Sequence, residues 1–456
     1  MERRRGQTRT PGERAGPMSS RSAALYERAK KVMPGGCSRN TILRKPHPIY
    51  ASHAKGCRVT DIEGTEYIDF ANNVASLIHG HAFPPMVEAV DKQLRKGTAF
   101  TVGTEAEVSF AEQMIERCDS FEKIRFVNSG TEAVMSCIKA ARAFTGRAKI
   151  AKVEGSYHGL YDYAEVSQTA KPENWGERDQ PKSVPVSFGT PKAALDDVIV
   201  IPFNDTARAL KILEMHKSEL AGILLDLLPH RIGVISAAPD FVEALRNWAD
   251  KNEALLIIDE VITLRTNFDG AQGGYCLRPD LTAMGKMIGG GFPVGAIAGR
   301  ADVMDVMDPT NGPAKFPHYG TFSANPITMT AGQVAMTYFD RLAVQKLNAL
   351  AEKARAQIAE AIAVADIPAC VTGAGSMFRV HFKATAPTDY RSAFMSTGEQ
   401  RALSNFLEHV FENGLLMIET GAGLLSTPMG QAEIDRMSEI MLGGFRKIGN
   451  SMLAEV

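Results

Sequence analysis

The sequence has few cysteines, no long apolar run and almost no net charge, and each of these absences excludes a class of protein. Its six cysteines are scattered over 456 residues without a CxxC pair, which is typical of a reduced, intracellular protein rather than of a disulfide framework or zinc site. No apolar run reaches the roughly 20 residues that span a bilayer. The formal net charge of -1 gives no electrostatic reason to expect a nucleic acid or an anionic membrane as partner. We therefore expect a cytoplasmic protein whose partners are small molecules or further copies of itself.

The composition is that of a globular protein, with 45% apolar and 23% charged residues, and the length suits two or three packed units. The first residues are basic and lack the apolar segment of a secretory signal. We expect four regions: a disordered extension (1–19), an N-terminal segment that joins a small domain (20–75), a large cofactor-binding domain (76–330) and a C-terminal small domain (331–456).

Short apolar runs alternate with helical patterns through the middle of the chain. Five of these runs are KIRFVNSG, KIAKVEG, VIVIPFN, AGILLDLLP and ALLIIDEV. Apolar strands that are buried on both faces, with helices between them, predict a mainly parallel α/β sheet. Before them, GCRVTDIEGTEYIDF predicts a hairpin. After them, residues 331–365 predict one long helix, and the remainder predicts a smaller α+β unit.

Two motifs in this α/β part suit an anionic ligand with a ring nitrogen. In FVNSGTEAV (126–134) a strand is followed by Ser129, Gly130 and Thr131 at the start of a helix, where backbone N–H groups favour a phosphate. An ordinary helix cap explains the same residues. In ALLIIDEV, Asp259 ends a buried strand, where it could hold a protonated pyridine nitrogen or simply cap the next turn.

Two further motifs contribute an aromatic ring and an amine. Tyr157 and His158 follow another strand, and Tyr157 could stack on a flat cofactor or only close the core. Lys286 stands in DLTAMGKMIGGGFPVGA, directly before a glycine-rich turn. A desolvated lysine has a lowered pKa and can form a Schiff base, whereas most lysines extend to solvent.

Taken together, the motifs SGTEA, GSYHG, DEV, MGKMIGGGFPVG and GTFSANP resemble the class III pyridoxal-phosphate aminotransferases. They occupy residues 129–133, 155–159, 259–261, 284–295 and 320–326, and the match extends from about residue 20 to the C-terminus. The resemblance implies the fold type I (aspartate-aminotransferase-like) architecture, a large domain with a mainly parallel sheet plus a small α+β domain. It also implies pyridoxal 5'-phosphate (PLP) as cofactor.

The resemblance further implies a role for each motif residue. Lys286 would carry the internal aldimine and move the proton, and Asp259 would hold the ring nitrogen protonated. The phosphate cradle would be Ser129, Gly130 and Thr131. The residues around the cofactor ring would be Tyr157, His158 and Val261. Thr321 would reach the cofactor of the neighbouring subunit. The last of these makes a homodimer necessary, with pairing into tetramers left open. His79 and His81 resemble a metal pair but offer only two imidazoles, and we expect no metal.

Within the family, two groups are most similar: glutamate-1-semialdehyde 2,1-aminomutase and aminotransferases of aromatic β-amino acids. Arg39 matches the residue that binds a substrate carboxylate in the second group, and Arg44 is a nearby competitor. Asp226 stands where many relatives have glutamate, and MIETGAGLLSTP lacks an arginine that some relatives use for a second carboxylate. A substrate with one carboxylate, or with its second group bound elsewhere, therefore fits better than a dicarboxylic acid.

Three functions compete at this point. The first is transfer of an amino group between an amino acid or amine donor, such as a β-amino acid, and a keto acid or aldehyde acceptor. The second is an aminomutase, which moves the amine within one molecule. The third is a binding protein that keeps the fold without turnover, against which the retained Lys286, Asp259 and Thr321 argue.

Overall fold

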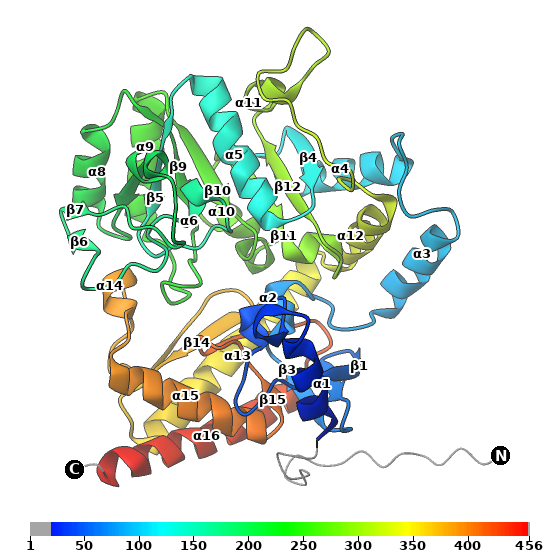
Figure 1. The fold of residues 1–456 in the computed structure, drawn as a ribbon, viewed down its shortest axis with the longest axis vertical. Helices are drawn as coiled ribbons and strands as arrows, with labels where there is room; N and C mark the ends of the chain where they lie inside the picture. The colour runs from blue at the N-terminus through cyan, green and yellow to red at the C-terminus, as the bar shows by residue number, and fades with distance from the viewer. Residues whose placement is uncertain (1–19, 455–456) are drawn as a thin grey trace.

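The largest layer of the molecule is a seven-stranded sheet in the upper half of Figure 1. The computed structural model describes residues 20–454. The strand order is β4–β12–β11–β10–β9–β5–β8, with the bounds Lys123–Val127 (β4), Lys149–Val153 (β5), Val198–Ile201 (β8), Leu220–Leu225 (β9), Leu255–Asp259 (β10), Leu281–Gly285 (β11) and Gly295–Gly299 (β12). Strand β12 is antiparallel to both of its neighbours, and the other pairs are parallel. The predicted mainly parallel sheet is confirmed.

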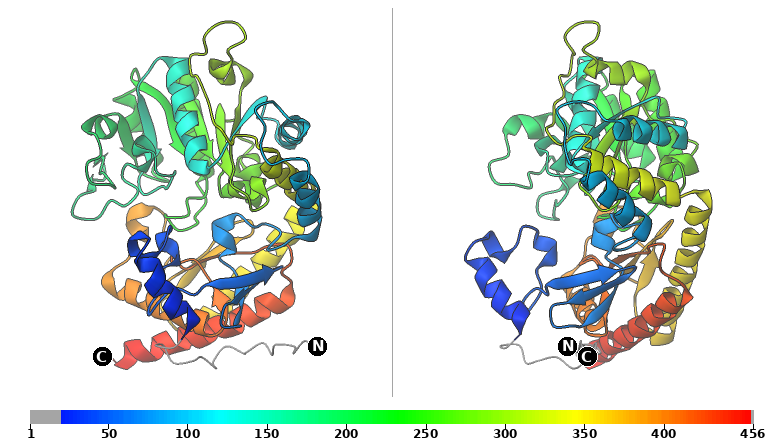
Figure 2. Two further views of the ribbon diagram at one scale, coloured as in Figure 1. Left: turned by 45° about the vertical axis from the view of Figure 1, so that its right-hand side comes forward. Right: turned by 90° about the vertical axis from the view of Figure 1, so that its right-hand side faces the viewer.

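Helices cover both faces of this sheet because its central strands are apolar on both sides. Along β10, Leu256 and Ile258 pack with the core under helices α8 (Thr206–Glu214) and α9 (Pro239–Lys251), whereas Leu255 and Ile257 pack with the core under α5 (Gly130–Thr145). Successive side chains of a strand point to opposite faces, so these helices lie on opposite sides. Figures 1 and 2 show α5 crossing one face of the sheet.

Two smaller sheets form a second unit below the first. One has the order β1–β2–β3–β15 and the other β13–β14–β16, with the bounds Ala51–Lys55 (β1), Arg58–Asp61 (β2), Glu66–Asp69 (β3), Cys370–Thr372 (β13), Met377–His381 (β14), Leu415–Leu416 (β15) and Ala422–Leu424 (β16). The β2–β3 hairpin is confirmed. Because β15 pairs with β3, the N-terminal strands lie against the C-terminal segment, as Figure 2 shows.

The prediction of one helix over residues 331–365 is wrong. The structure has two, α12 (Pro326–Tyr338) and α13 (Arg341–Ala365). Phe339 leaves the helical region with φ -98° and ψ 58°, and the side chain of Asp340 accepts a hydrogen bond from the backbone N–H of Ala343. An aspartate N-cap of this kind starts a new helix. The chain therefore breaks into two helices at Phe339 and Asp340, although the apolar pattern continues through both.

The remaining elements connect and cover these sheets. The helices are α1 (Arg21–Lys30), α2 (Asn72–Ala75), α3 (Pro84–Leu94), α4 (Glu105–Arg117), α6 (Asp162–Glu165), α7 (Lys192–Asp196), α10 (Gly270–Gly274), α11 (Ala301–Met304), α14 (Tyr390–Ala393), α15 (Thr397–Glu412) and α16 (Gln431–Ala454). Short 3₁₀ turns are η1 (Pro34–Gly36), η2 (Asn40–Ile42), η3 (Thr263–Thr266), η4 (Lys286–Gly289) and η5 (Asp305–Met307), and a small ribbon pairs β6 (Gly176–Glu177) with β7 (Gln180–Pro181). Within residues 20–454, no helix is long and apolar enough to cross a membrane. The predicted extension 1–19 lies outside the described residues.

Candidate active site

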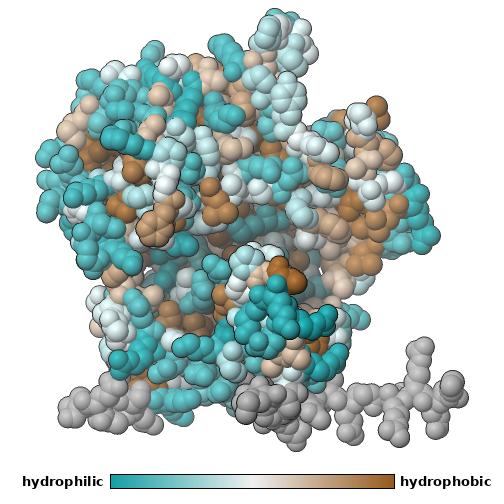
Figure 3. All heavy atoms as spheres, viewed as in Figure 1, coloured by the Kyte–Doolittle hydropathy of each residue, from teal (hydrophilic) through white to brown (hydrophobic). Residues whose placement is uncertain are grey.

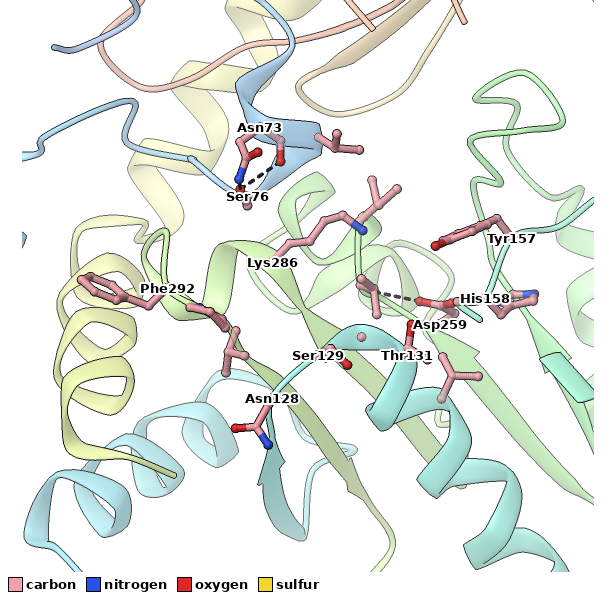
Figure 4. Close-up of a pocket in the computed structure, with 18 of the residues that line it drawn as sticks. Asn73, Ser76, Asn128, Ser129, Thr131, Tyr157, His158, Asp259, Lys286 and Phe292 are labelled. Carbon is pink, nitrogen blue, oxygen red and sulfur yellow. Dashed lines mark hydrogen bonds and ion pairs between the residues drawn. The ribbon is translucent and has the colours of Figure 1, made fainter. Parts of the chain in front are cut away.

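A pocket opens where several parallel strands of the large sheet end (Figure 4). Four of its residues follow four different strands: Tyr157 comes after β5, Asp226 after β9, Asp259 ends β10, and Lys286 follows β11. Ligands of open α/β sheets bind at this edge because the carboxyl ends of parallel strands and the loops after them meet there. The structure therefore brings together motifs that are far apart in the sequence.

The floor of the pocket is the N-terminus of helix α5. Ser129 caps the helix, and its hydroxyl accepts a hydrogen bond from the N–H of Glu132 at 3.1 Å. The N–H groups of Gly130 and Thr131, in the first turn, have no partner within the helix. A Cβ at Gly130 would lie 2.8 Å from Cγ1 of Val261, so this position accepts no side chain. The result is a close-packed, electropositive cradle for an anion.

Asp259 and His158 form a buried pair beside this cradle. Nδ1 of His158 lies 2.7 Å from Oδ2 of Asp259, and the other carboxyl oxygen accepts from the N–H of Val261 at 2.9 Å. Burial lowers the pKa of His158, although Asp259 partly opposes this shift. The imidazole is therefore neutral near pH 7 and donates from Nδ1, which orients the carboxyl group. Among the described residues, Nε2 of His158 has no hydrogen-bond partner.

Lys286 reaches across the pocket from the short turn η4 (Figure 4). Its backbone adopts φ +52°, a left-handed conformation that costs a lysine conformational energy. Its amine makes no hydrogen bond or ion pair with any residue in the range 20–454. Burial lowers the pKa of Lys286, and the nearby Asp259 and Asp226 partly restore it. Desolvation thus favours the neutral, nucleophilic amine.

Asp226 is the second carboxyl group of the pocket. Burial and the neighbouring Asp259 raise the pKa of Asp226 well above its ordinary value. Its Oδ1 accepts a hydrogen bond from the N–H of Leu228 at 2.8 Å. A raised pKa favours the protonated form of the carboxyl group, which can donate a hydrogen bond.

The rim contains residues that the sequence motifs predict and others that they do not. Arg39 lines the pocket, and its Nη1 donates to Oδ1 of Asn73 at 2.8 Å, whereas Arg44 lies 3.2 Å over the ring of Phe411. Sequence reasoning missed several lining residues, among them Asn73, Ser76 and Asn128. Of these, only Asn128 carried a signal, because it directly precedes the SGT motif.

Three other candidate residues lie outside the pocket. Thr321 is exposed and is not among the lining residues. His79 contacts Thr427 and the carbonyl of Ala335, each at 2.9 Å, and His81 lies 2.8 Å from Asp69. Each imidazole therefore has partners within the fold, and no group of three or more His, Cys, Asp or Glu in the described part of the chain could hold a metal ion.

The combined features define a class of enzyme: one that uses an unpaired lysine, a buried carboxyl group and a helix N-terminus to bind a phosphorylated organic cofactor. The family model of the class-III aminotransferases matches residues 42–438, so the chain belongs to this PLP-dependent enzyme family. The resemblance, the fold type I architecture and the cofactor predicted from the sequence are confirmed.

Several known proteins are similar over most of the chain. The omega-transaminase from Sphaerobacter thermophilus has 44% identity and a TM-score of 0.92, and the match covers 94% of this chain and 98% of that one. The beta-phenylalanine aminotransferase from Variovorax paradoxus has 32% identity and a TM-score of 0.82, with coverage of 92% and 93%. Glutamate-1-semialdehyde 2,1-aminomutase from Methanothermobacter thermautotrophicus is 37% identical over 374 residues, which cover 82% of this chain and 86% of that protein.

Proposed function

We propose that the protein is a transaminase that moves an amino group from an amino acid or amine to a keto acid or aldehyde. The observation that carries this proposal is the unpaired Lys286 amine, with its lowered pKa, in one pocket with Asp259 and the α5 cradle. When bound, PLP supplies an electron sink for the substrate carbon. The name of the omega-transaminase relative supports transfer between molecules.

The pocket residues suit this cofactor in size and charge. The cradle at Ser129, Gly130 and Thr131 suits the phosphate, since it offers backbone donors and lacks side-chain bulk. Asp259, oriented by His158, suits a protonated ring nitrogen through a charge-assisted hydrogen bond. Tyr157 and Val261 suit the two faces of the ring. Lys286 binds the cofactor and moves the substrate proton, for which its lowered pKa is an advantage.

Arg39 is the proposed anchor for a substrate carboxylate. Its side chain lines the pocket and is oriented by Asn73, and a guanidinium pairs well with a carboxylate. Because the Variovorax paradoxus relative is named for beta-phenylalanine, β-amino acids belong among the first donors to test. For Arg39→Gln we expect a rise in KM for carboxylate donors and little change for simple amines.

The second candidate is an aminomutase, favoured by the names of the curated relatives. Incubation of the enzyme with a panel of amino donors plus pyruvate or 2-oxoglutarate separates the two. New alanine or glutamate supports transfer between molecules, whereas isomerisation of glutamate-1-semialdehyde without transfer would refute the first proposal. Lys286→Ala should lose turnover and the long-wavelength absorbance of bound cofactor, while the surface variant Lys217→Ala keeps both.

We further propose a homodimer in which Thr321 serves the neighbouring subunit. Exposed apolar residues gather around α3 and α4 at the right of Figure 3, among them Val87, Leu94, Phe100 and Val102, and Tyr319 and Phe322 flank the exposed Thr321. Apolar patches of this kind are usual at subunit interfaces.

Mixing two inactive variants tests this assembly. In a hybrid of Lys286→Ala and Thr321→Asp subunits, one site carries both lesions and the other carries none. Random exchange should therefore restore about a quarter of the activity in a two-fold symmetric dimer. If Thr321 acted within its own subunit, no activity would return.

A further inference from the structure

Arg231 is a cation that lies next to Tyr157, a residue of the pocket, although Arg231 is not itself among the residues that line it. It is exposed, and its guanidinium makes no ion pair and no hydrogen bond within residues 20–454. Its one described partner is the ring of Tyr157, whose centroid lies 5.4 Å from Cζ of Arg231. Tyr157 lines the pocket and is 39% exposed. The guanidinium therefore lies beside the cofactor pocket with all five of its N–H donors available.

The loop that presents Arg231 is held rigidly. The carbonyl of Pro229 accepts from the N–H groups of Ile232 and Val234, which closes a tight turn. From the small-sheet unit, Nη1 of Arg379 donates to the carbonyl of His230 at 2.8 Å and to that of Arg231 at 3.3 Å. A charge on a loop tied down in this way loses little entropy when it binds a ligand.

The charges around Arg231 leave it without a carboxylate partner in the protein. Asp226, on the same connection after β9, has a pKa raised by burial and by Asp259, which favours its uncharged form, and it makes no ion pair with Arg231. Asp259 is paired with His158. His230 has a pKa lowered to about 3 by burial and by Arg379, so it adds no charge. The guanidinium of Arg379, bonded to the carbonyl of Arg231, adds a second positive charge, and no carboxylate of the described residues pairs with Arg231. This corner of the protein therefore suits an anionic group from a ligand.

The partners of Arg39 and Arg231 lie on different sides of the pocket. Arg39 is bonded to Asn73, and Arg231 stacks on Tyr157. Figure 4 shows Asn73 and Tyr157 on different sides of Lys286, which extends between them. A molecule whose reacting carbon lies at Lys286 could thus have an anionic group on each side.

We propose that Arg231 binds the second carboxylate of a dicarboxylic keto acid acceptor, of which 2-oxoglutarate is the simplest natural example. This inference rests on the proposed transaminase function, in which Arg39 binds the other carboxylate. Under this proposal the enzyme accepts a diacid although the segment MIETGAGLLSTP has no arginine. The second group is bound elsewhere, from the loop after β9.

The first test measures binding without turnover, in the cofactor-loaded enzyme. Glutarate and pentanoate have the same chain length and differ by one carboxylate, so calorimetric titration isolates the contribution of the second charge. Arg231→Gln should weaken glutarate binding by about 10- to 100-fold, as expected for a lost charge-assisted bond, and should leave pentanoate within about threefold. Arg231→Lys, which keeps the charge and loses the fork, should fall between them. The surface variant Arg436→Gln should behave as wild type.

The second test uses the reaction itself, with pyruvate and 2-oxoglutarate as acceptors for one donor. Arg231→Gln should lower kcat/KM for 2-oxoglutarate by about 10- to 100-fold and for pyruvate by less than about threefold. Equal losses for both acceptors, equal losses for glutarate and pentanoate, or a wild type that uses pyruvate and ignores 2-oxoglutarate would overturn the proposal. If the wild type transfers no amino group to any acceptor, the transaminase proposal fails, and the glutarate titration still decides the role of Arg231.

Discussion

A buried ion pair between the two units predicts a large loss of stability when it is broken. Arg391 on α14 donates from Nε and Nη2 to the two carboxyl oxygens of Glu154, at 2.9 and 3.0 Å. It also donates to the carbonyls of Gly176 and Trp175, at 2.9 and 3.2 Å, and lies over the Trp175 ring. The two side chains are only 9% and 4% exposed. Glu154 directly precedes Gly155, which begins the turn to Tyr157.

Arg391→Met keeps the length of the side chain and removes the charge. Glu154 is then left buried without its cation, which should cost about 3 to 5 kcal/mol of unfolding free energy. Burial already raises the pKa of Glu154, and Arg391 is the first of the groups that oppose this rise, so the variant should raise the pKa of Glu154 further. The same loss should loosen the turn that carries Tyr157 and lower the affinity for PLP.

The matched control is a second ion pair at α14, made by the N-cap residue Asp389. Arg178 pairs with Asp389 at 2.6 Å, but Arg178 is 50% exposed, so Arg178→Gln should cost no more than about 1 kcal/mol. Urea denaturation at fixed protein and cofactor concentrations compares the two variants, and Glu154→Gln/Arg391→Met completes a double-mutant cycle with a coupling of at least about 2 kcal/mol. A loss for Arg391→Met that is no larger than that of the control would refute this reasoning.

Two further predictions concern buried groups outside the pocket. Lys152 is fully buried, and burial lowers its pKa to about 7. Its amine donates to the carbonyls of Val153, Ser156 and Val166, and the shortest of these bonds is 2.6 Å, to Val166. The carbonyl of Val153 also accepts from the N–H of Ser156, so Lys152→Met leaves the carbonyls of Ser156 and Val166 without a donor and should lower the unfolding free energy by about 2 kcal/mol. Thermal denaturation at pH 8 can measure this loss, and an unchanged midpoint would show that the carbonyls find other donors. His381 has a pKa lowered to about 3 by burial and by Arg379, so the unfolded chain takes up a proton below pH 6.5 while the folded chain does not. Between pH 7 and pH 5 this residue should therefore remove about 2 kcal/mol of stability, and His381→Gln should be less acid-sensitive by that amount; equal pH slopes for the two proteins would contradict this.

Much of the fold could be predicted from local patterns. The apolar runs all became strands of one sheet, and the hairpin formed around Glu63 and Gly64, because short apolar runs and turn residues act over a few positions. The break between α12 and α13 was not predicted, because Asp340 caps α13 inside an apolar pattern that also suits one continuous helix. Local propensity does not distinguish a cap from an exposed acidic residue.

The sequence by itself determined the strand-end positions of Asp259 and Lys286 and the cradle at the start of α5, since each depends on a strand or helix that its own neighbours encode. Only the tertiary structure decided which of these groups meet. The His158–Asp259 pair and the placement of Arg231 over Tyr157 join segments that are far apart in the chain. Such contacts depend on the order of strands in the sheet, which long-range packing selects and no local pattern specifies. The lowered pKa of the Lys286 amine also depends on the tertiary structure. Several elements pack around this residue and exclude water from it, whereas its own segment alone would leave it exposed.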